Sequence, residues 1–330
     1  MKRRIPAEWE EQEALIVVFP PKQSDWSHSL EEIHHSYREF ISKIARFQKC
    51  LVICEDKTAL ANLLPNLQNI ELIQMQTNDT WIRDFGGINI YKNHKRKTYD
   101  FIFNAWGNKF EANLDNSITQ QLFKEGHLKG KLKSLDFVLE GGSIDSNGHG
   151  VMLSTAYCLF EENRNPELSK KKIKKTLMRL FGLKKLIVLK HGALMGDDTD
   201  SHIDTLARFI NKKTIAYVKC YDKEDEHYEE LKKMEKELQK TGYDLLPLPL
   251  PSAKYFNNHR IPATYMNFVL INNAVLVPIY SDPYDEEVLE IFRASFPERE
   301  IVGIESSVFI REHGSLHCAS MNIYTPRDDA

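Results

Sequence analysis

The sequence predicts an α/β fold built from about five similar β-β-α-β units. Two observations support this: one order of strands and helices recurs along the chain, and it recurs at a regular interval. Glu140, His202 and Tyr265 open successive units, 62 and 63 residues apart. A regular interval of this size indicates an array of equal supersecondary units. If the units surround a common axis, their equivalent positions converge there, and we expect a site at that point.

The N-terminal segment predicts strand, helix, strand, helix and strand in turn. Its first strand is a short β-branched run closed by two prolines, which indicates burial on both faces. Its first helix has apolar residues at spacings of three and four. The elements cover residues 14–19, 27–47, 51–54, 57–64 and 70–74. We expect them to complete the ring opposite a truncated C-terminal hairpin that begins at Cys318.

Three complete units follow, each consisting of a hairpin, a helix and a further strand. The first has strands 136–140 and 151–154 turned at 146–148, helix 166–181 and strand 186–189. The second has strands 202–210 and 214–218, helix 225–240 and strand 243–248. The third has strands 265–271 and 274–279, helix 284–296 and strand 301–303.

The composition is that of an ordinary globular protein, with 42% hydrophobic and 28% charged residues. A net charge of -3 gives no electrostatic case for binding nucleic acid. The five cysteines are scattered without CxxC spacing, which argues against a disulfide framework and a structural zinc site. The longest apolar run is too short to span a membrane, and no signal-peptide pattern is present. We therefore expect a single catalytic domain, residues 1–330, in the cytoplasm.

Titratable residues occupy the equivalent positions of the units: Asp84, Glu140, His202 with Asp204, and Cys318. A cysteine in an apolar run after a Gly-Ser pair is a candidate nucleophile, although a small buried hydrophobe is the alternative. On a strand, the period of two would place His202 and Asp204 on one face. The alternative for His202 and Asp204 is that they are simply polar surface residues at the edge of a strand.

Asp84 and Glu140 each precede a pair of glycines, which permit close approach of the backbone to a ligand. The alternative for Asp84 is an Asx turn, and the alternative for the glycines after Glu140 is a hinge in the backbone. His317 adjoins Cys318, but adjacent side chains of an extended segment point to opposite faces. His202 is therefore the better candidate for the general base.

An excess of carboxylates around a cysteine indicates a cationic substrate, and a planar guanidinium can pair with two of them. The acidic run 197–204 offers a different interpretation, because oxygen ligands with an imidazole suit a divalent metal. That interpretation would leave Cys318 unused.

An ordered set of motifs from residue 5 to about residue 322 resembles the agmatine deiminases. The motifs are Ile5-Pro6-Ala7-Glu8-Trp9-Glu10, Trp81-Ile82-Arg83-Asp84, Phe103-Asn104-Ala105-Trp106-Gly107, Glu140-Gly141-Gly142-Ser143-Ile144, Asn163-Arg164-Asn165-Pro166, His202-Ile203-Asp204 and Leu316-His317-Cys318. These enzymes belong to the guanidino-group-modifying (pentein) superfamily and are related to the bacterial-type peptidylarginine deiminases. The resemblance implies a five-bladed, pseudo-fivefold α/β-propeller and a hydrolase acting on C-N bonds of linear amidines.

The resemblance also implies a role for each site residue. Cys318 would be the nucleophile, His202 the acid and base, Asp84 and Asp204 the guanidinium clamps, Glu140 a supporting acid, and Trp81, Asp198 and Trp106 substrate-site residues. Agmatine would be hydrolysed to N-carbamoylputrescine and ammonia through a covalent Cys318 amidino-thioether, without cofactor or metal. Such an activity is linked to putrescine and polyamine biosynthesis.

Several alternatives remain open from the sequence. The substrate could be arginine or peptidyl arginine, an amidinotransferase shares the covalent step, and a metal-dependent hydrolase or a non-catalytic polyamine-binding protein would use other chemistry. We expect a small cationic guanidino substrate and no nucleic-acid or membrane partner, with a homodimer as one option. His313-Gly314-Ser315 departs from the glycine run that is usual before the cysteine.

Overall fold

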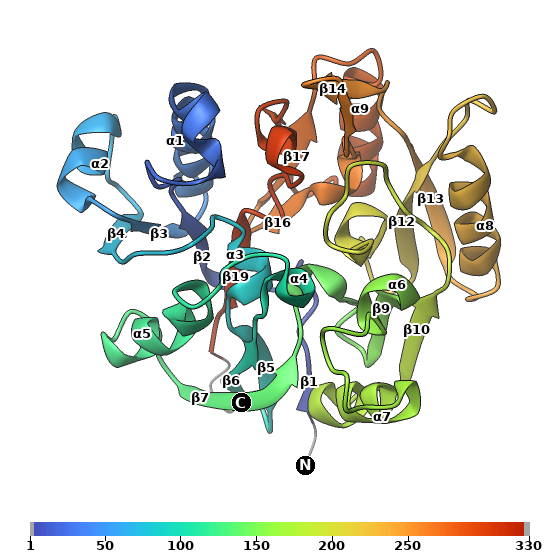
Figure 1. Cartoon of the computed structure of the whole chain (residues 1–330), viewed down its shortest axis with the longest axis horizontal. Coiled ribbons are helices and arrows are strands. Elements are labelled where there is room, and N and C mark those ends of the chain that lie inside the picture. Colours follow the sequence, from blue (N-terminus) through green and yellow to red (C-terminus); the bar gives the residue numbers. More distant parts are fainter. Residues whose placement is uncertain (1–2, 327–330) are drawn as a thin grey trace.

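Each of the predicted units forms a small sheet of its own. The computed structural model describes residues 3–326, so the ends of the expected domain, 1–2 and 327–330, lie outside the described part. In every unit an antiparallel strand pair is followed by a helix and a strand parallel to the second. A parallel return requires a crossover, which the helix supplies. Figure 1 shows the sheets around a central region that contains α3 (Ile82–Phe85) and β19 (Ser320–Tyr324).

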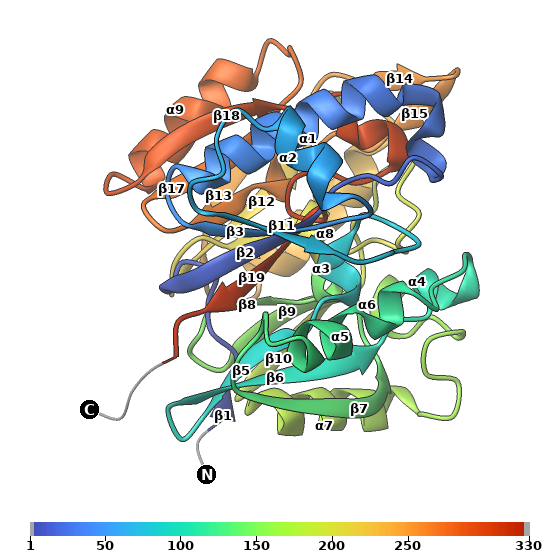
Figure 2. The ribbon, with the colours of Figure 1, turned by 90° about the vertical axis from the view of Figure 1, so that its left-hand side faces the viewer.

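One sheet joins the two ends of the described chain. β2 (Gln12–Val18) pairs antiparallel with β19 and parallel with β3 (Lys49–Cys54), and β4 (Ile70–Gln74) completes the sheet. Figure 2 shows β19 beside β2, as these pairings require. The helices are η1 (Asp25–Ser29), α1 (Leu30–Ala45) and α2 (Lys57–Leu63). β19 pairs directly with β2, so the N-terminal strand lies beside the C-terminal strand, and the completion of a ring stays a prediction.

Most of the second sheet comes from residues for which no strand is predicted, although the end of its last strand overlaps the expected strand 136–140. It contains β1 (Arg3–Arg4), β5 (Ile88–Lys92), β6 (Lys95–Ile102) and β7 (Lys131–Val138). Its helices are α4 (Ala105–Asn108), η2 (Asp115–Ser117) and α5 (Ile118–Lys124).

The other sheets correspond to the three complete units. The first contains β8 (Asp145–Ser146), β9 (Val151–Thr155) and β10 (Lys185–Leu189), with η3 (Gly141–Ser143), α6 (Ala156–Leu159) and α7 (Lys170–Phe181). The next contains β11 (Ala207–Phe209), β12 (Thr214–Lys219) and β13 (Asp244–Pro249), with η4 (Ile203–Thr205) and α8 (Tyr228–Gln239). The last contains β16 (Val269–Ile271), β17 (Ala274–Ile279) and β18 (Glu300–Glu305), with η5 (Tyr265–Asn267), α9 (Asp285–Ser295) and η6 (Phe309–Glu312). A separate hairpin consists of β14 (Lys254–Phe256) and β15 (His259–Ile261).

Three local predictions are wrong. The start of the expected strand 265–271 is the turn η5, and the strand begins only at Val269. Residues 136–138 end β7, which lies parallel to β6, so they do not form a hairpin with β9. The true partner of β9 is the two-residue β8, because Gly141–Ser143 turns the chain between β7 and β8. The start of the expected strand 202–210 is instead the turn η4, and the strand begins only at Ala207.

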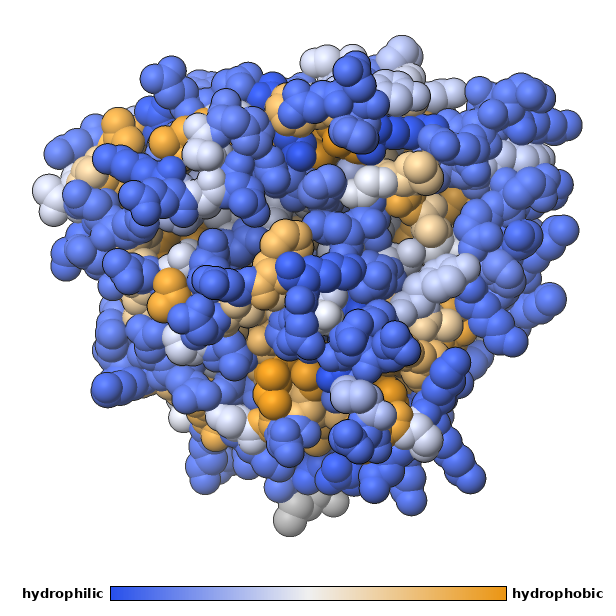
Figure 3. All heavy atoms as spheres, viewed as in Figure 1, coloured by the Kyte–Doolittle hydropathy of each residue, from blue (hydrophilic) through white to orange (hydrophobic). Residues whose placement is uncertain are grey.

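The face of the molecule in Figure 3 is mostly hydrophilic, with apolar side chains in separate small groups. Within residues 3–326, no helix combines the length and the apolar character that crossing a membrane would require.

Candidate active site

Short turns at the start of successive units bring the predicted site residues together. Asp84 lies in α3, Glu140 precedes η3, His202 and Asp204 belong to the turn η4, and Cys318 lies in the loop before β19. The turns α3, η3, η4 and η5 contact one another in series. The convergence expected from the repeat is therefore confirmed, although His202 and Asp204 reach it from a turn and not from a strand.

The sulfur of Cys318 lies between an amide and a carboxylate. Nδ2 of Asn267 donates to Sγ at 3.2 Å, and Oδ2 of Asp204 lies 3.8 Å from Sγ. Oδ1 of Asn267 accepts the backbone N–H groups of His317 and Cys318 at 2.9 and 3.2 Å, which fixes the loop. Burial, Asp204 and Asp84 raise the pKa of the thiol well above its usual value. A cation bound beside these carboxylates would favour the thiolate.

His202 is fully buried between two acids. Its Nε2 lies 3.0 Å from Oε2 of Glu140, and its Nδ1 lies 3.6 Å from Oδ1 of Asp84. Burial alone would lower the pKa of His202, but Asp84, Cys158 and Glu140 raise it well above the usual value. The ring is therefore an imidazolium at neutral pH. Its Nδ1 has no hydrogen-bond partner among the described residues, so one N–H remains available.

Asp84 is held by one backbone and one side-chain donor. Its Oδ1 accepts the backbone N–H of Gly142 at 2.9 Å, and its Oδ2 accepts Nε1–H of Trp106 at 3.0 Å. Burial raises the pKa of Asp84 to about 6, against the opposing effect of His202. Trp106 adopts a φ of 54°, a conformation uncommon for a residue other than glycine. The local backbone thus places the indole N–H behind the carboxylate.

Asp204 uses one oxygen and leaves the other free. Its Oδ2 lies 2.6 Å from Nδ1 of His317, and its Oδ1 is buried without a hydrogen-bond partner in the described chain. Burial would raise the pKa of Asp204, but the bond to His317 lowers it. Asp204 is therefore ionised, and one oxygen can accept a hydrogen bond from a ligand.

Gly142 lies where three of these side chains meet. A Cβ atom there would lie 2.6 Å from Nδ1 of His202, 2.9 Å from Oδ1 of Asp84 and 3.1 Å from Oδ2 of Asp204. No side chain fits in that space. This explains the glycine after Glu140 and Gly141, which the sequence analysis attributed to close backbone approach.

Glu140 connects His202 to a buried arginine. Nε of Arg164 lies 2.8 and 2.9 Å from the two oxygens of Glu140, and Sγ of Cys158 lies 3.3 Å from Oε2. His202 and Arg164 lower the pKa of Glu140 to about 2 despite its burial. Glu140 is therefore an anion that keeps His202 protonated.

Glu140, Cys158 and His202 are also close enough to hold a metal ion, since their ligand atoms lie within 4.8 Å of one another. Metal ligation requires a neutral imidazole and a thiolate. His202 is protonated, burial raises the pKa of Cys158 to about 11, and Arg164 occupies Glu140. The residues suit a hydrogen-bonded ion network better than a metal.

The acidic run 197–204 does not form a cluster of that kind. Asp197 accepts the backbone N–H groups of Thr199 and Ser201 at 3.3 and 2.6 Å, as in a turn. Asp200 binds Arg164 at 2.7 Å and Asp204 binds His317. Asp197, Asp200 and Asp204 thus have different local partners.

A narrow pocket of about 10 Å³ leads to Cys318. The residues that line it are Trp81, Asp84, Trp106, Asp197, Asp198, Thr199, His202, Thr205, Glu312, His313, Gly314 and Cys318. The predicted substrate-site residues Trp81, Trp106 and Asp198 are all among them. Four of these lining residues are carboxylates and none is a lysine or arginine. The pocket suits a cation along its whole length.

His313 and Gly314, which stand where a run of glycines is usual before the cysteine, line this pocket. His313 adopts a φ of 68°, and its Nδ1 lies 2.6 Å from the carbonyl oxygen of Gly196 on the facing loop. A Cβ atom on Gly314 would lie 2.5 Å from the ring of Trp81. Gly314 is therefore the one glycine of the usual run that this chain keeps, and it stands where a side chain would collide with the indole of Trp81.

Three residues of the site were not singled out from the sequence. Asn267 contacts Sγ, Arg164 holds Glu140, and His317 holds Asp204. Asn267 could have been found from the repeat, because it lies at the start of the unit that opens near Tyr265. Arg164 was quoted within a motif but given no role. His317 was considered only as a base.

The model of the Porphyromonas-type peptidyl-arginine deiminase family matches residues 4–323. The chain belongs to this family. It is 49% identical to a cysteine-to-serine variant of the C. jejuni agmatine deiminase with substrate bound, with a TM-score of 0.96 over 99% of this chain and 98% of that one. An agmatine deiminase from Enterococcus faecalis superposes with a TM-score of 0.89 at 26% identity, covering 98% and 96% of the two chains.

A curated relative, the agmatine deiminase of Pseudomonas aeruginosa, is 28% identical over 357 residues, which cover 98% of this chain and 96% of the relative. A dimethylarginine dimethylaminohydrolase is only 11% identical, with a TM-score of 0.50, and supports the mixed α/β fold alone. The relatives and solved structures named here therefore include enzymes whose names give a guanidino compound as substrate.

Proposed function

We propose that this protein is an agmatine deiminase, a hydrolase that converts agmatine and water to N-carbamoylputrescine and ammonia. The observation that carries the proposal is the convergence of a thiol, an imidazolium and two carboxylates above Gly142. Two atoms of this group, Nδ1 of His202 and Oδ1 of Asp204, are buried without partners among residues 3–326. A buried polar atom without a hydrogen-bond partner is costly. A bound guanidinium would donate to Oδ1 of Asp204, and its leaving nitrogen would accept the Nδ1 proton of His202 once sulfur has attacked and that nitrogen carries a lone pair.

In the first half-reaction Asp84 and Asp204 bind the guanidinium, and the thiol of Cys318 releases its proton to solvent as the cation enters, where it converts the ammonia released later to ammonium. The sulfur attacks the central carbon and forms a C–S bond. His202 donates the Nδ1 proton to the departing nitrogen, the C–N bond breaks, and ammonia leaves. An amidino-thioether on Cys318 and a neutral His202 remain.

In the second half-reaction water supplies the ureido oxygen. The neutral His202 takes one proton from the attacking water, and the other proton returns to the sulfur as the C–S bond breaks. Thiol and imidazolium are thereby regenerated. Glu140, paired with Arg164, stabilises the imidazolium in both steps. The sequence of steps uses no cofactor.

Agmatine fits the pocket better than arginine does, because agmatine carries a second cationic group at its far end. Asp198 and Glu312 also line the pocket, and we place that ammonium beside them. The α-carboxylate of arginine would face these acids without a cationic partner. We assign Asp198 and Glu312 to the ammonium group, and Trp81 and Trp106 to the walls of the pocket.

We also propose that the sheets form a five-bladed α/β-propeller and that residues 1–330 are one catalytic domain. The similar topology of the units and the convergence of their first turns support this arrangement. A cytoplasmic location and a role in polyamine synthesis stay predictions.

The decisive experiment compares ammonia release from agmatine, arginine and a peptidyl arginine, for the wild type and for Cys318→Ser. We expect turnover to be greatest on agmatine and absent in the variant. A large preference for arginine would refute the substrate assignment. Inhibition by EDTA together with an active Cys318→Ala variant would indicate a metal hydrolase. Turnover that requires an added amine would indicate an amidinotransferase, and binding without ammonia would indicate a polyamine-binding protein.

A further inference from the structure

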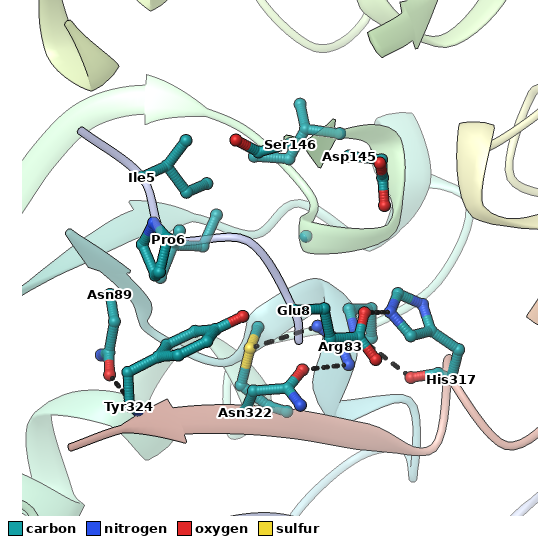
Figure 4. Close-up of a pocket in the computed structure, with 14 residues that line it drawn as sticks. Ile5, Pro6, Glu8, Arg83, Asn89, Asp145, Ser146, His317, Asn322 and Tyr324 are labelled. Carbon is teal, nitrogen blue, oxygen red and sulfur yellow. Dashed lines mark hydrogen bonds and ion pairs between the residues drawn. The ribbon is translucent and has the colours of Figure 1, made fainter. Parts of the chain in front are cut away.

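A second cavity lies behind the loop that carries Cys318. It has a volume of about 60 Å³, enough for ordered water, and shares no lining residue with the substrate pocket. His317 lines this cavity and Cys318 lines the other, so the two sides of the loop face different spaces. Figure 4 shows Glu8, Arg83 and His317 pointing toward one another in the cavity. The catalytic loop is thus supported from behind by charged side chains.

Glu8 is the centre of this group, although it lies more than 300 residues from His317 in the chain. One of its oxygens accepts the backbone N–H of Leu270 at 2.7 Å. The other contacts Arg208 and lies 2.9 Å from Nε2 of His317. Burial would raise the pKa of Glu8, but Arg208 and His317 hold it well below its usual range. Glu8 is therefore a buried anion in contact with His317.

His317 lies between two ionised carboxylates. Its Nδ1 is 2.6 Å from Oδ2 of Asp204, and its Nε2 is 2.9 Å from Oε2 of Glu8. Ionised carboxylates only accept hydrogen bonds, whereas a neutral imidazole has only one N–H to donate. Both contacts are satisfied only if each ring nitrogen carries a proton. The geometry therefore requires an imidazolium directly behind Asp204.

This arrangement fixes both the charge and the orientation of Asp204. The bond from Nδ1 of His317 occupies Oδ2, so the carboxylate cannot rotate without losing a short charge-assisted contact. Oδ1 is then left as the oxygen without a partner in the described chain. The hydrogen-bond donors to Asp84 are instead a backbone amide and an indole, and its charged neighbour His202 is farther away, at 3.6 Å. The two clamps are thus held by different means.

We propose that Glu8 and His317 are positioning residues of the active site. Glu8 keeps the His317 ring doubly protonated, and that ring holds Asp204 as an ionised clamp with Oδ1 free for the substrate cation. Neither residue touches the reacting atoms, and both act through Asp204. The inference rests on the proposed function, because it assumes that Asp204 binds a guanidinium or amidinium group.

The test measures how Cys318 distinguishes a cation from a neutral molecule of the same shape. 2-Chloroacetamidine and 2-chloroacetamide each alkylate the sulfur, forming a C–S bond and releasing chloride. The ratio of their rates reports recognition of the amidinium, whichever substrate the enzyme turns over. We compare the wild type with Glu8→Gln, in which the anion is lost and the His317 ring can give up its Nε2 proton. Glu10→Gln is the matched control, because Glu10 anchors the same segment through Arg4 without contacting His317.

We expect Glu8→Gln to lower the rate ratio by about ten- to a hundredfold, the loss typical of a hydrogen bond to a charged group. The control should keep the wild-type ratio. The pKa of Asp204 should also rise in Glu8→Gln, because this carboxylate loses its charged partner, and its titration should add to the acidic limb of the pH–rate profile that Asp84 sets in the wild type. A purely structural role for Glu8 would change the melting temperature without either effect.

Three outcomes would overturn the proposal. These are that the wild type reacts no faster with the amidine, that a folded Glu8→Gln variant keeps the wild-type rate ratio, or that Glu8→Gln and Glu10→Gln lower that ratio equally. If Glu8→Gln does not fold, His317→Gln takes its place, since that change removes the charge and keeps a polar side chain. Failure of the proposed function would be visible separately, as a wild type that prefers the amidine but releases no ammonia from agmatine.

Discussion

Asp84 is the proposed guanidinium clamp whose charge changes closest to neutral pH. Burial raises its pKa to about 6, whereas the bond to His317 lowers that of Asp204. Above pH 6 both carboxylates are ionised and can hold the cation. Below pH 6 Asp84 becomes neutral and leaves the guanidinium with one clamp. The value of kcat/KM for agmatine should therefore fall as the pH decreases through about 6.

Asp84→Asn tests this assignment. The amide removes the negative charge but keeps the size of the side chain, so kcat/KM at pH 7.5 should fall by at least about a hundredfold, as for loss of one partner of a buried ion pair. Asp56→Asn, the same change at the exposed N-cap of α2, should have no such effect. A wild-type profile that is flat between pH 5 and 7 would contradict the role given to Asp84.

The reactive residues of the site could be predicted from the sequence more readily than the residues that position them. Asp84, Glu140, His202, Asp204 and Cys318 are titratable groups at the equivalent positions of a repeat, a pattern that can be seen without coordinates. Asn267 is uncharged and Glu8 is remote in sequence, so their contacts with the site depend on how the units pack. Only the fold shows that His317 faces Asp204.

At the scale of elements, the sequence predicted regular strands and helices well and the site turns poorly. β17 (Ala274–Ile279) has its predicted bounds because a continuous apolar run between turns specifies a buried strand. η4 was predicted as a strand because its short polar-apolar alternation resembles one. Turns of three residues form too few local hydrogen bonds to specify themselves. Contacts among α3, η3, η4 and η5 fix their shape.

Arg164 links two of these elements and provides a test of their stability. Its guanidinium binds Glu140 before η3 and Asp200 before η4, and its side chain is 3% exposed. Arg164→Met would leave Glu140 buried without its cation. We expect the free energy of unfolding to fall by about 3–5 kcal/mol, measured by denaturant titration. Arg179→Met, on the exposed face of α7, should change it by less than about 0.5 kcal/mol. If Arg164→Met and Arg179→Met lowered the free energy of unfolding by the same small amount, the ion pair of Arg164 would not stabilise the turns.

At the scale of the whole molecule, polar contacts join the sheet of the chain ends to the last complete unit. Nε2 of Gln12 donates to the carbonyl of Leu270 at 2.7 Å, and Nδ2 of Asn272 donates to the carbonyl of Gln12 at 2.7 Å. Gln48 accepts the backbone N–H of Asn272 at 2.8 Å. β2 and β19 lie in one sheet, so neither end of the described chain can leave without breaking it.

These contacts cross between two apolar clusters that would otherwise be separate cores. One cluster contains Trp26, Trp81 and Trp106, and the other contains Cys220 and the apolar face of α8. If residues 1–330 are one domain, both clusters should unfold together. Tryptophan fluorescence of a Trp9→Phe variant reports the first cluster, because Trp9 packs against the second. Alkylation of Cys220, located by mass spectrometry, reports the second, because this thiol is buried in the folded protein. We expect both probes to give the same denaturant midpoint. Two distinct midpoints would instead show that the clusters belong to separately folding domains.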